Sequence, residues 1–195
     1  YRARDLSAGH AGGADGSGAG GPVKGLLRAG YADEMRLAEA ILDSWDRNNA
    51  ILVNLLGAIP ADAMDLRAME GGPTIGELFV HMSYVRLAFV YEDIPGFVAE
   101  EPREEWVAGL APARMAAMLR ESARTVREAV AHSLETDAGT RMHYDHPILL
   151  LQHMIWHEGY HHGQIKLALK LAGRPLADDA IGPVTWSLWM DKGPR

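Results

Sequence analysis

Apolar residues recur at helical spacing along most of the chain after Tyr31, and this pattern predicts four long helices. The first helix is expected over residues 32–58, because Pro60 cannot continue it. One face of this helix carries apolar side chains and one amide at intervals of three and four residues: Leu37, Ile41, Trp45, Asn48, Leu52 and Leu55.

The second helix is expected to begin at Thr74 and to end before Pro95. Thr74 and Glu77 have the spacing of a capping box, in which each residue satisfies a backbone N–H of the other. The inward face of this helix is predicted to consist of Ile75, Leu78, His81, Val85 and Phe89.

The third and fourth helices are expected over residues 112–132 and 146–172. A proline suits the first turn of the third helix, and Gly173 followed by Pro175 is a stop signal for the fourth. The inward face of the third helix is predicted to consist of Met115, Leu119, Ser122, Val126 and Val130.

These elements indicate an all-α fold, a four-helix bundle in which residues 93–111 make one long crossing. No run of alternating residues predicts a strand, and the 195 residues suit one domain. A short helical turn is expected over 103–109. Residues 176–195 are expected to be irregular, and Trp186 and Trp189 indicate that this segment packs against another part of the protein.

Residues 1–30 differ from the rest, because they hold nine of the 21 glycines. Such a segment cannot bury enough apolar surface to offset its ordering entropy, so a disordered Gly-rich tail is predicted, followed by the bundle over 31–195. The tail lacks the continuous apolar stretch of a secretory signal. A cytoplasmic location is therefore expected.

The amino-acid composition excludes several kinds of partner and of catalytic group. The net charge of −7, with no cluster of basic residues, argues against nucleic acid as a partner. No apolar run approaches the roughly 18 residues of a membrane span. There is no cysteine, so the protein has no thiol nucleophile of its own, and any metal must be held by nitrogen and oxygen atoms.

His157 and His161 are the most informative of the nine histidines. Their spacing places both imidazoles on one side of a helix, one turn apart, where two ring nitrogens can reach one metal at about 2.0–2.1 Å. Residues 157–161 also match the HExxH pattern of zinc proteases. The extended protease motif would need glycine and histidine where Gln164 and Leu167 stand, and no glutamate follows Glu158, so the protease reading is disfavoured.

The third ligand is predicted to be His81, because it falls on the inward face of the second helix. Glu77, one turn before His81, and His153, one turn before His157, are candidates to orient the ligands through contacts outside the metal's own coordination. His153 could also be a further ligand or a base. Each has a plainer reading, Glu77 as part of the capping box and His153 as a packed neighbour. A purely structural histidine-rich core is the plainest alternative for the whole cluster.

Two segments together resemble the DinB-like superfamily, which includes the bacillithiol- and mycothiol-dependent transferases. They are residues 74–81, TIGELFVH, and residues 157–165, HEGYHHGQI. The likeness extends over about residues 31–173 in helix order and length. It implies a four-helix bundle, often dimeric, that binds a divalent metal through His81, His157 and His161.

The resemblance further implies a function, in which the metal activates an external low-molecular-weight thiol for attack on an electrophile. The expected cofactor is one divalent ion, such as zinc, nickel or iron. Metal-assisted hydrolysis is an alternative. So is a bundle that binds a metal or a small molecule without turnover, which a site buried behind Trp186 and Trp189 would favour.

Overall fold

The computed structural model describes residues 22–191, with side chains from residue 36 onward. Its main elements are four long helices, and the described residues contain no β-strand beyond an isolated bridge between Arg67 and Thr74. The predicted all-α class is therefore confirmed. In chain order the helices are α1 (Pro22–Ala58), the 3₁₀ turn η1 (Ala61–Ala63), α2 (Ile75–Asp93), α3 (Pro112–Thr136), α4 (Pro147–Leu171), the short α5 (Asp178–Ile181) and the 3₁₀ turn η2 (Trp186–Trp189).

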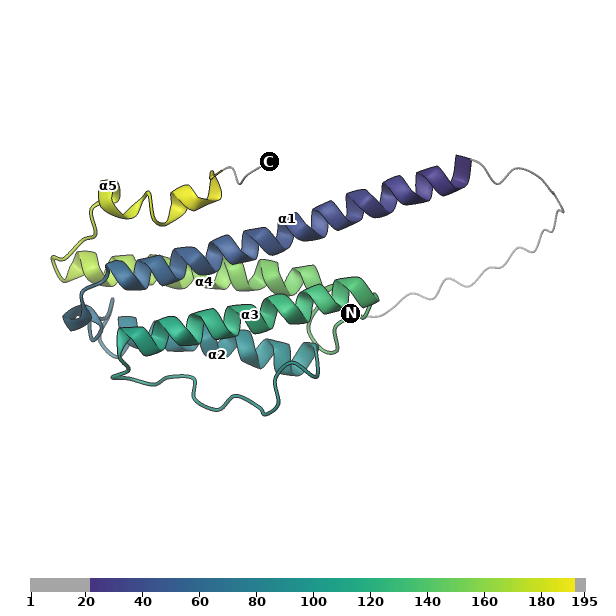
Figure 1. The fold of residues 1–195 in the computed structure, drawn as a ribbon. Helices are drawn as coiled ribbons and strands as arrows, with labels where there is room; N and C mark the ends of the chain where they lie inside the picture. The colour runs from purple at the N-terminus through teal and green to yellow at the C-terminus, as the bar shows by residue number, and fades with distance from the viewer. Residues whose placement is uncertain (1–21, 192–195) are drawn as a thin grey trace, which may run out of the picture. The chain divides into compact units, whose positions relative to one another are not determined.

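From Leu37 onward, α1 packs with α2, α3 and α4 as a four-helix bundle (Figure 1). Helices α2 and α3 run in the same direction, and the segment 94–111 crosses the length of the bundle to connect them. Helices α1 and α4 run the opposite way. The single long crossing is the one that the sequence predicts, and its course along α2 brings loop residues close to that helix.

Helix α1 begins at Pro22, ten residues before the predicted start. Proline is favourable in a first helical turn, because its missing N–H is not needed there and its fixed φ is helical. Residues 22–30 are therefore helical, in contrast to the predicted tail. Residues 1–21 lie outside the described residues, and the division of the chain at residue 30 stays a prediction.

The predicted helix ends are confirmed at α2 and α4. The Glu77 backbone N–H donates to Thr74 Oγ1 at 3.1 Å, and the Thr74 N–H donates to Glu77 Oε2 at 2.7 Å, which completes the capping box. After α4, Gly173 adopts a φ of +71°, the left-handed conformation that glycine reaches without strain.

The inward faces of the helices are largely as predicted. Trp45, Leu52 and Leu55 of α1 are buried, and so are all five predicted positions of α3. On α1 Leu37 is 60% exposed and Ile41 is only partly buried, because the buried core begins at Leu42. On α2 nearly every position before Leu87 is buried, on all sides of the helix, whereas the predicted inward residue Phe89 is only partly buried.

The segment after α4 is more ordered than predicted, since it contains α5 and η2. It packs beside α1, where the Asn54 amide donates to the Val184 carbonyl at 2.7 Å and Arg47 donates to the Leu188 carbonyl. Its tryptophans, Trp186 and Trp189, stay 53% and 43% exposed. The segment 103–109 is not helical, which corrects that prediction.

Candidate metal centre

Three histidine rings from two helices meet between α2 and α4. Nε2 of His157 lies 3.2 Å from Nε2 of His81 and 2.9 Å from Nε2 of His161. One ring nitrogen of each histidine lies within 4.8 Å of a ring nitrogen of each of the other two. His81 and His161 are buried and His157 is partly buried. The structure thus brings together all three of the predicted ligands.

Helix geometry explains the convergence. His157 and His161 are one turn apart on α4, so both rings leave the helix on the same side. His81 sits on α2, and its ring centroid lies 5.1 Å from that of His157 and 4.9 Å from that of His161. Two ligands from one helix and one from its neighbour are a common way to build a metal site in a bundle.

The outer nitrogens of two of these rings face oxygen acceptors. Nδ1 of His161 lies 2.7 Å from Gln164 Oε1, and the Gln164 amide nitrogen donates to the Tyr160 hydroxyl at 3.0 Å. Nδ1 of His81 lies 2.9 Å from Glu105 Oε1, although the ring N–H is not aligned for a linear hydrogen bond. These acceptors favour the proton on Nδ1, so Nε2 of His81 and of His161 presents a lone pair to the centre.

The surroundings keep the three rings neutral. Burial lowers the pKa of His157 to about 4, and a proton on His157 is further disfavoured by electrostatic interaction with His161, His81, His153 and Arg86. Burial also lowers the pKa of His81 and of His161. A neutral imidazole is the form that binds a metal, so the nitrogens are available at neutral pH without the need to displace a proton.

The separations of the His157 nitrogen from the other two nitrogens fit a single ion. Two nitrogens that each lie about 2.0–2.1 Å from one metal are separated by about 2.9–3.4 Å in octahedral or tetrahedral geometry. The two measured separations, 2.9 and 3.2 Å, fall in that range. Without a cation, the Nε2 lone pairs of His81 and of His161 would both face Nε2 of His157, which can donate a single hydrogen. The three-histidine group could therefore bind one metal.

The crossing segment between α2 and α3 supplies two further contacts that sequence analysis missed. Besides the contact of Glu105 with His81, the indole of Trp106 stacks on the His81 ring, with centroids 4.1 Å apart and planes 5° apart. Adjacent loop residues thus hold one ligand from two directions. No periodic pattern marks them, because the loop reaches His81 only through the course of the crossing.

Neither residue proposed to support the ligands contacts them by hydrogen bond in the described part of the chain. The Glu77 carboxylate is engaged in the capping box with Thr74, its plainer reading. Nδ1 of His153 lies 2.7 Å from the Tyr144 hydroxyl, and its ring packs one turn before His157 at 6.3 Å between centroids. Gln164 and Glu105 occupy the supporting positions instead.

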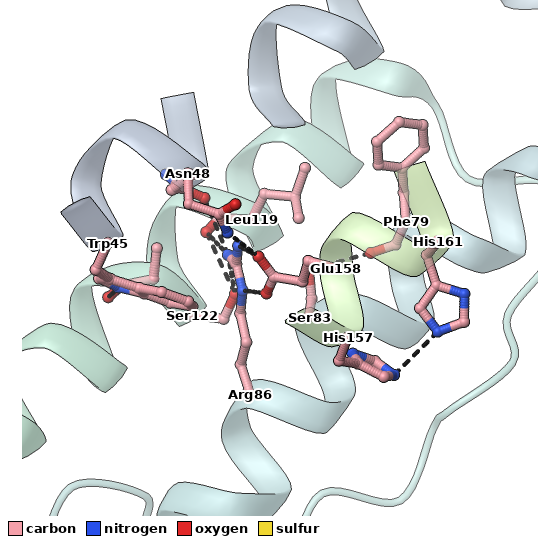
Figure 2. Close-up of polar contacts among 12 residues, drawn as sticks. Trp45, Asn48, Phe79, Ser83, Arg86, Leu119, Ser122, His157, Glu158 and His161 are labelled. Carbon is pink, nitrogen blue, oxygen red and sulfur yellow. Dashed lines mark hydrogen bonds and ion pairs between the residues drawn. The ribbon is translucent and has the colours of Figure 1, made fainter. Parts of the chain in front are cut away.

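Glu158 points away from the histidines, into the middle of the bundle (Figure 2). Its carboxylate accepts from Arg86 Nε at 2.5 Å and from Arg86 Nη2 at 3.0 Å, and the Asn48 amide donates to the same carboxylate at 2.5 Å. Both Arg86 and Glu158 are completely buried. Glu158 therefore has no access to a water at the histidine centre, which removes the general base that an HExxH protease needs.

Arg86 is held on all sides. Its Nη1 donates to the Leu119 carbonyl at 2.7 Å and to the Asn49 amide oxygen at 2.9 Å, and its guanidinium lies 4.8 Å from the centre of the Trp45 ring. This buried pair connects α1, α2, α3 and α4 immediately beside the ligand-bearing turn of α4 (Figure 2). It fixes how α2 and α4 face each other, and with them the separation of the three histidines.

Replacing Glu105 by alanine should lower the affinity for a divalent metal about ten- to hundredfold, the usual cost of losing an outer partner of a ligand. The reason is that His81 loses the acceptor that favours its Nδ1–H form. Competition with a chelating dye measures the affinity. Glu104→Ala, at the exposed neighbouring position, is the control and should bind as the parent does. Equal affinity in all three proteins would contradict this role for Glu105.

The fold and centre define a helical bundle that carries a three-histidine candidate metal site. The profile of the DinB family matches residues 35–183, and the chain belongs to this family, which is associated with metal binding. The predicted resemblance is thereby confirmed. Neither a curated protein nor a solved structure matches the chain. Within the described residues, no helix is both long enough and apolar enough to cross a membrane.

Proposed function

We propose that this protein holds one divalent metal ion with His81, His157 and His161 and activates an external low-molecular-weight thiol for attack on an electrophile. The observation that carries the proposal is the convergence of three neutral Nε2 atoms at 2.9 and 3.2 Å. Zinc, nickel or iron suits such a set of nitrogen donors. Family membership supports the same reading.

The proposal of an external thiol rests on the metal-binding histidines and on the amino-acid composition. A bound divalent cation would favour the thiolate form of a coordinated thiol, whose ordinary pKa is about 8.5. The chain has no cysteine, so the sulfur must belong to a cosubstrate. Three protein donors fill only part of the coordination that these metals take, as in catalytic sites rather than structural ones.

The chain's own residues have separate tasks in this scheme. The three histidines hold the ion, and Gln164 and Glu105 keep two of their rings in the binding tautomer. The indole of Trp106 covers one face of His81 and is 47% exposed, so it lies between the centre and solvent. It is therefore placed to contact a cosubstrate that approaches from outside.

A binding protein without turnover is the second candidate. A centre sealed behind Trp186 and Trp189 would favour this candidate, but these tryptophans belong to the segment that packs beside α1 (Figure 1). The indole that stacks on the centre, on the His81 ring, is that of the half-exposed Trp106. Hydrolysis is less well supported, because Glu158 is committed to Arg86 and cannot act as a base at the centre.

The partners follow from the same scheme. They would be a small thiol and an electrophile, while the net charge of −7 argues against nucleic acid. A homodimer is in keeping with the family resemblance, and sedimentation of the purified protein tests it. A cytoplasmic location remains part of the proposal.

The experiment is a turnover assay of metal-loaded protein with a panel of cellular thiols and a chromogenic electrophile such as 1-chloro-2,4-dinitrobenzene. Thiol consumption faster than with metal-free protein supports the proposal, and no turnover with any pair contradicts it. Ester cleavage without added thiol, in the same preparation, would favour metal-assisted hydrolysis instead.

A further inference from the structure

A hollow of about 330 Å³ lies beside the histidine centre, at the start of α2. It is lined by Arg67, Gly71, Gly72, Pro73, Glu77 and Trp106. Its volume is at the lower end of the range for small-molecule sites, which is roughly 300–1,000 Å³. The hollow therefore suits one end of a small metabolite rather than a peptide or a nucleic acid.

Trp106 connects the hollow to the centre. The same indole that stacks on His81 at 4.1 Å also lines the hollow. Glu77, which also lines the hollow, stands one turn before His81 on α2. Two residues that line the hollow are thus neighbours of the ligand His81, one by ring stacking and one along α2.

The walls of the hollow are held in place by backbone contacts. The Ile75 N–H donates to the Leu66 carbonyl at 2.8 Å, and the Gly76 N–H donates to the Met64 carbonyl at 2.9 Å, so the turn before α2 is tied to the helix start. Gly71, with a φ of +71°, has no side chain to fill the space. The backbone on this side of the hollow is therefore held in place before a ligand binds, which reduces the entropic cost of binding.

The hollow presents one positive and one negative group. Nη1 of Arg67 donates to the Gly72 carbonyl at 3.2 Å, which orients the guanidinium. A guanidinium has five N–H donors, so the others remain for a ligand. Glu77 is ionised, since the Thr74 backbone N–H holds the pKa of its carboxyl below the ordinary value. A ligand with only negative charge would be attracted by Arg67 and repelled by Glu77.

We propose that this hollow binds the α-amino-carboxylate end of the thiol cosubstrate, with the carboxylate on Arg67, the ammonium on Glu77 and the carbon chain against Trp106. The identity of the bound molecule as a thiol rests on the proposed function, whereas recognition of the α-amino-carboxylate group does not. A zwitterion matches both charges of the hollow, and a phosphate or a simple dicarboxylate matches only one.

Three sulfur-free probes with a similar carbon chain test the recognition: L-2-aminobutyrate carries both charges, butyrate only the carboxylate and propylamine only the ammonium. The readout is the indole N–H signal of Trp106 in a ¹H–¹⁵N spectrum of the metal-loaded protein, assigned from its loss in Trp106→Phe. L-2-Aminobutyrate should bind about tenfold more tightly than either singly charged probe, since each lost charged hydrogen bond costs about that factor.

Two variants remove the charges with little change of shape. Arg67→Gln and Glu77→Gln should each weaken L-2-aminobutyrate about tenfold. Glutamine preserves the capping box, so the second variant keeps its helix start. Arg124→Gln, which removes an exposed arginine on α3, is the control and should bind as the parent does. The proposal is overturned if the Trp106 signal does not move, if the three probes bind alike, or if both hollow variants bind like the control.

A second measurement separates this proposal from the proposed function. Cobalt-loaded protein is titrated with γ-glutamylcysteine and with glutarylcysteine, which lacks the amino group, and the thiolate-to-cobalt absorption is followed. Tighter binding of the amino compound, lost in Glu77→Gln, supports the hollow as part of the thiol site. If neither thiol gives the absorption, thiol activation fails, while the titration with sulfur-free probes still decides what the hollow binds.

Discussion

Replacing His157 by alanine is expected to lower the affinity for a divalent metal by at least about a hundredfold, the upper end of what loss of an outer partner costs. His157 is the central ligand, since its Nε2 lies 3.2 Å from that of His81 and 2.9 Å from that of His161. Without His157, the nitrogens of His81 and His161 lose the one ring whose Nε2 lies close to both of them. Titration against a chelating dye measures the change.

The matched control is His162→Ala. This residue follows His161 on the same helix and is likewise partly buried, but its ring is not part of the cluster of three. It should keep the metal affinity of the parent. Equal loss in the two variants would mean that the helix, rather than the ligand, is responsible, and unchanged binding in His157→Ala would contradict the assignment.

Breaking the buried pair of Arg86 and Glu158 is expected to destabilise the fold by about 3–5 kcal/mol, because removal of one partner leaves the other charge buried and uncompensated. Glu158→Gln and Arg86→Met each test this prediction by urea denaturation. The effect is large because Arg86 also bonds to the Leu119 carbonyl and to the Asn49 amide oxygen, contacts that fix it in the core.

The double variant, Arg86→Met with Glu158→Gln, should recover part of the loss, since no unpaired charge remains. A single variant that costs less than about 1 kcal/mol would show that water reaches the pair, as at surface ion pairs. Metal affinity measured in the folded single variants should also fall, because the pair fixes how α2 and α4 face each other.

The sequence predicts the features that local rules determine. Thr74 and Glu77 have the spacing of a capping box, and Gly173 ends α4, because helix ends depend on residues close in the chain. The three histidines follow from the same kind of rule. His157 and His161 are one turn apart, and His81 lies on a predicted inward face.

What the sequence does not predict depends on contacts between distant segments. Glu105 and Trp106 reach His81 only because the crossing between α2 and α3 runs along the bundle. Glu158 lies between two ligands in the chain, yet it faces Arg86, 72 residues away. The sequence does contain one indication that Arg86 is buried. Helix α2 is apolar on nearly all sides, and an arginine in such a helix must be buried and must find a buried acceptor.

The central claim is that His81, His157 and His161 hold one divalent ion, and an anomalous-difference map tests it most directly. Crystals of zinc-loaded protein are measured on both sides of the zinc absorption edge. The account predicts one strong peak about 2.0–2.1 Å from Nε2 of each of the three histidines. A peak at other residues, or none at the triad in protein saturated with zinc, would contradict it.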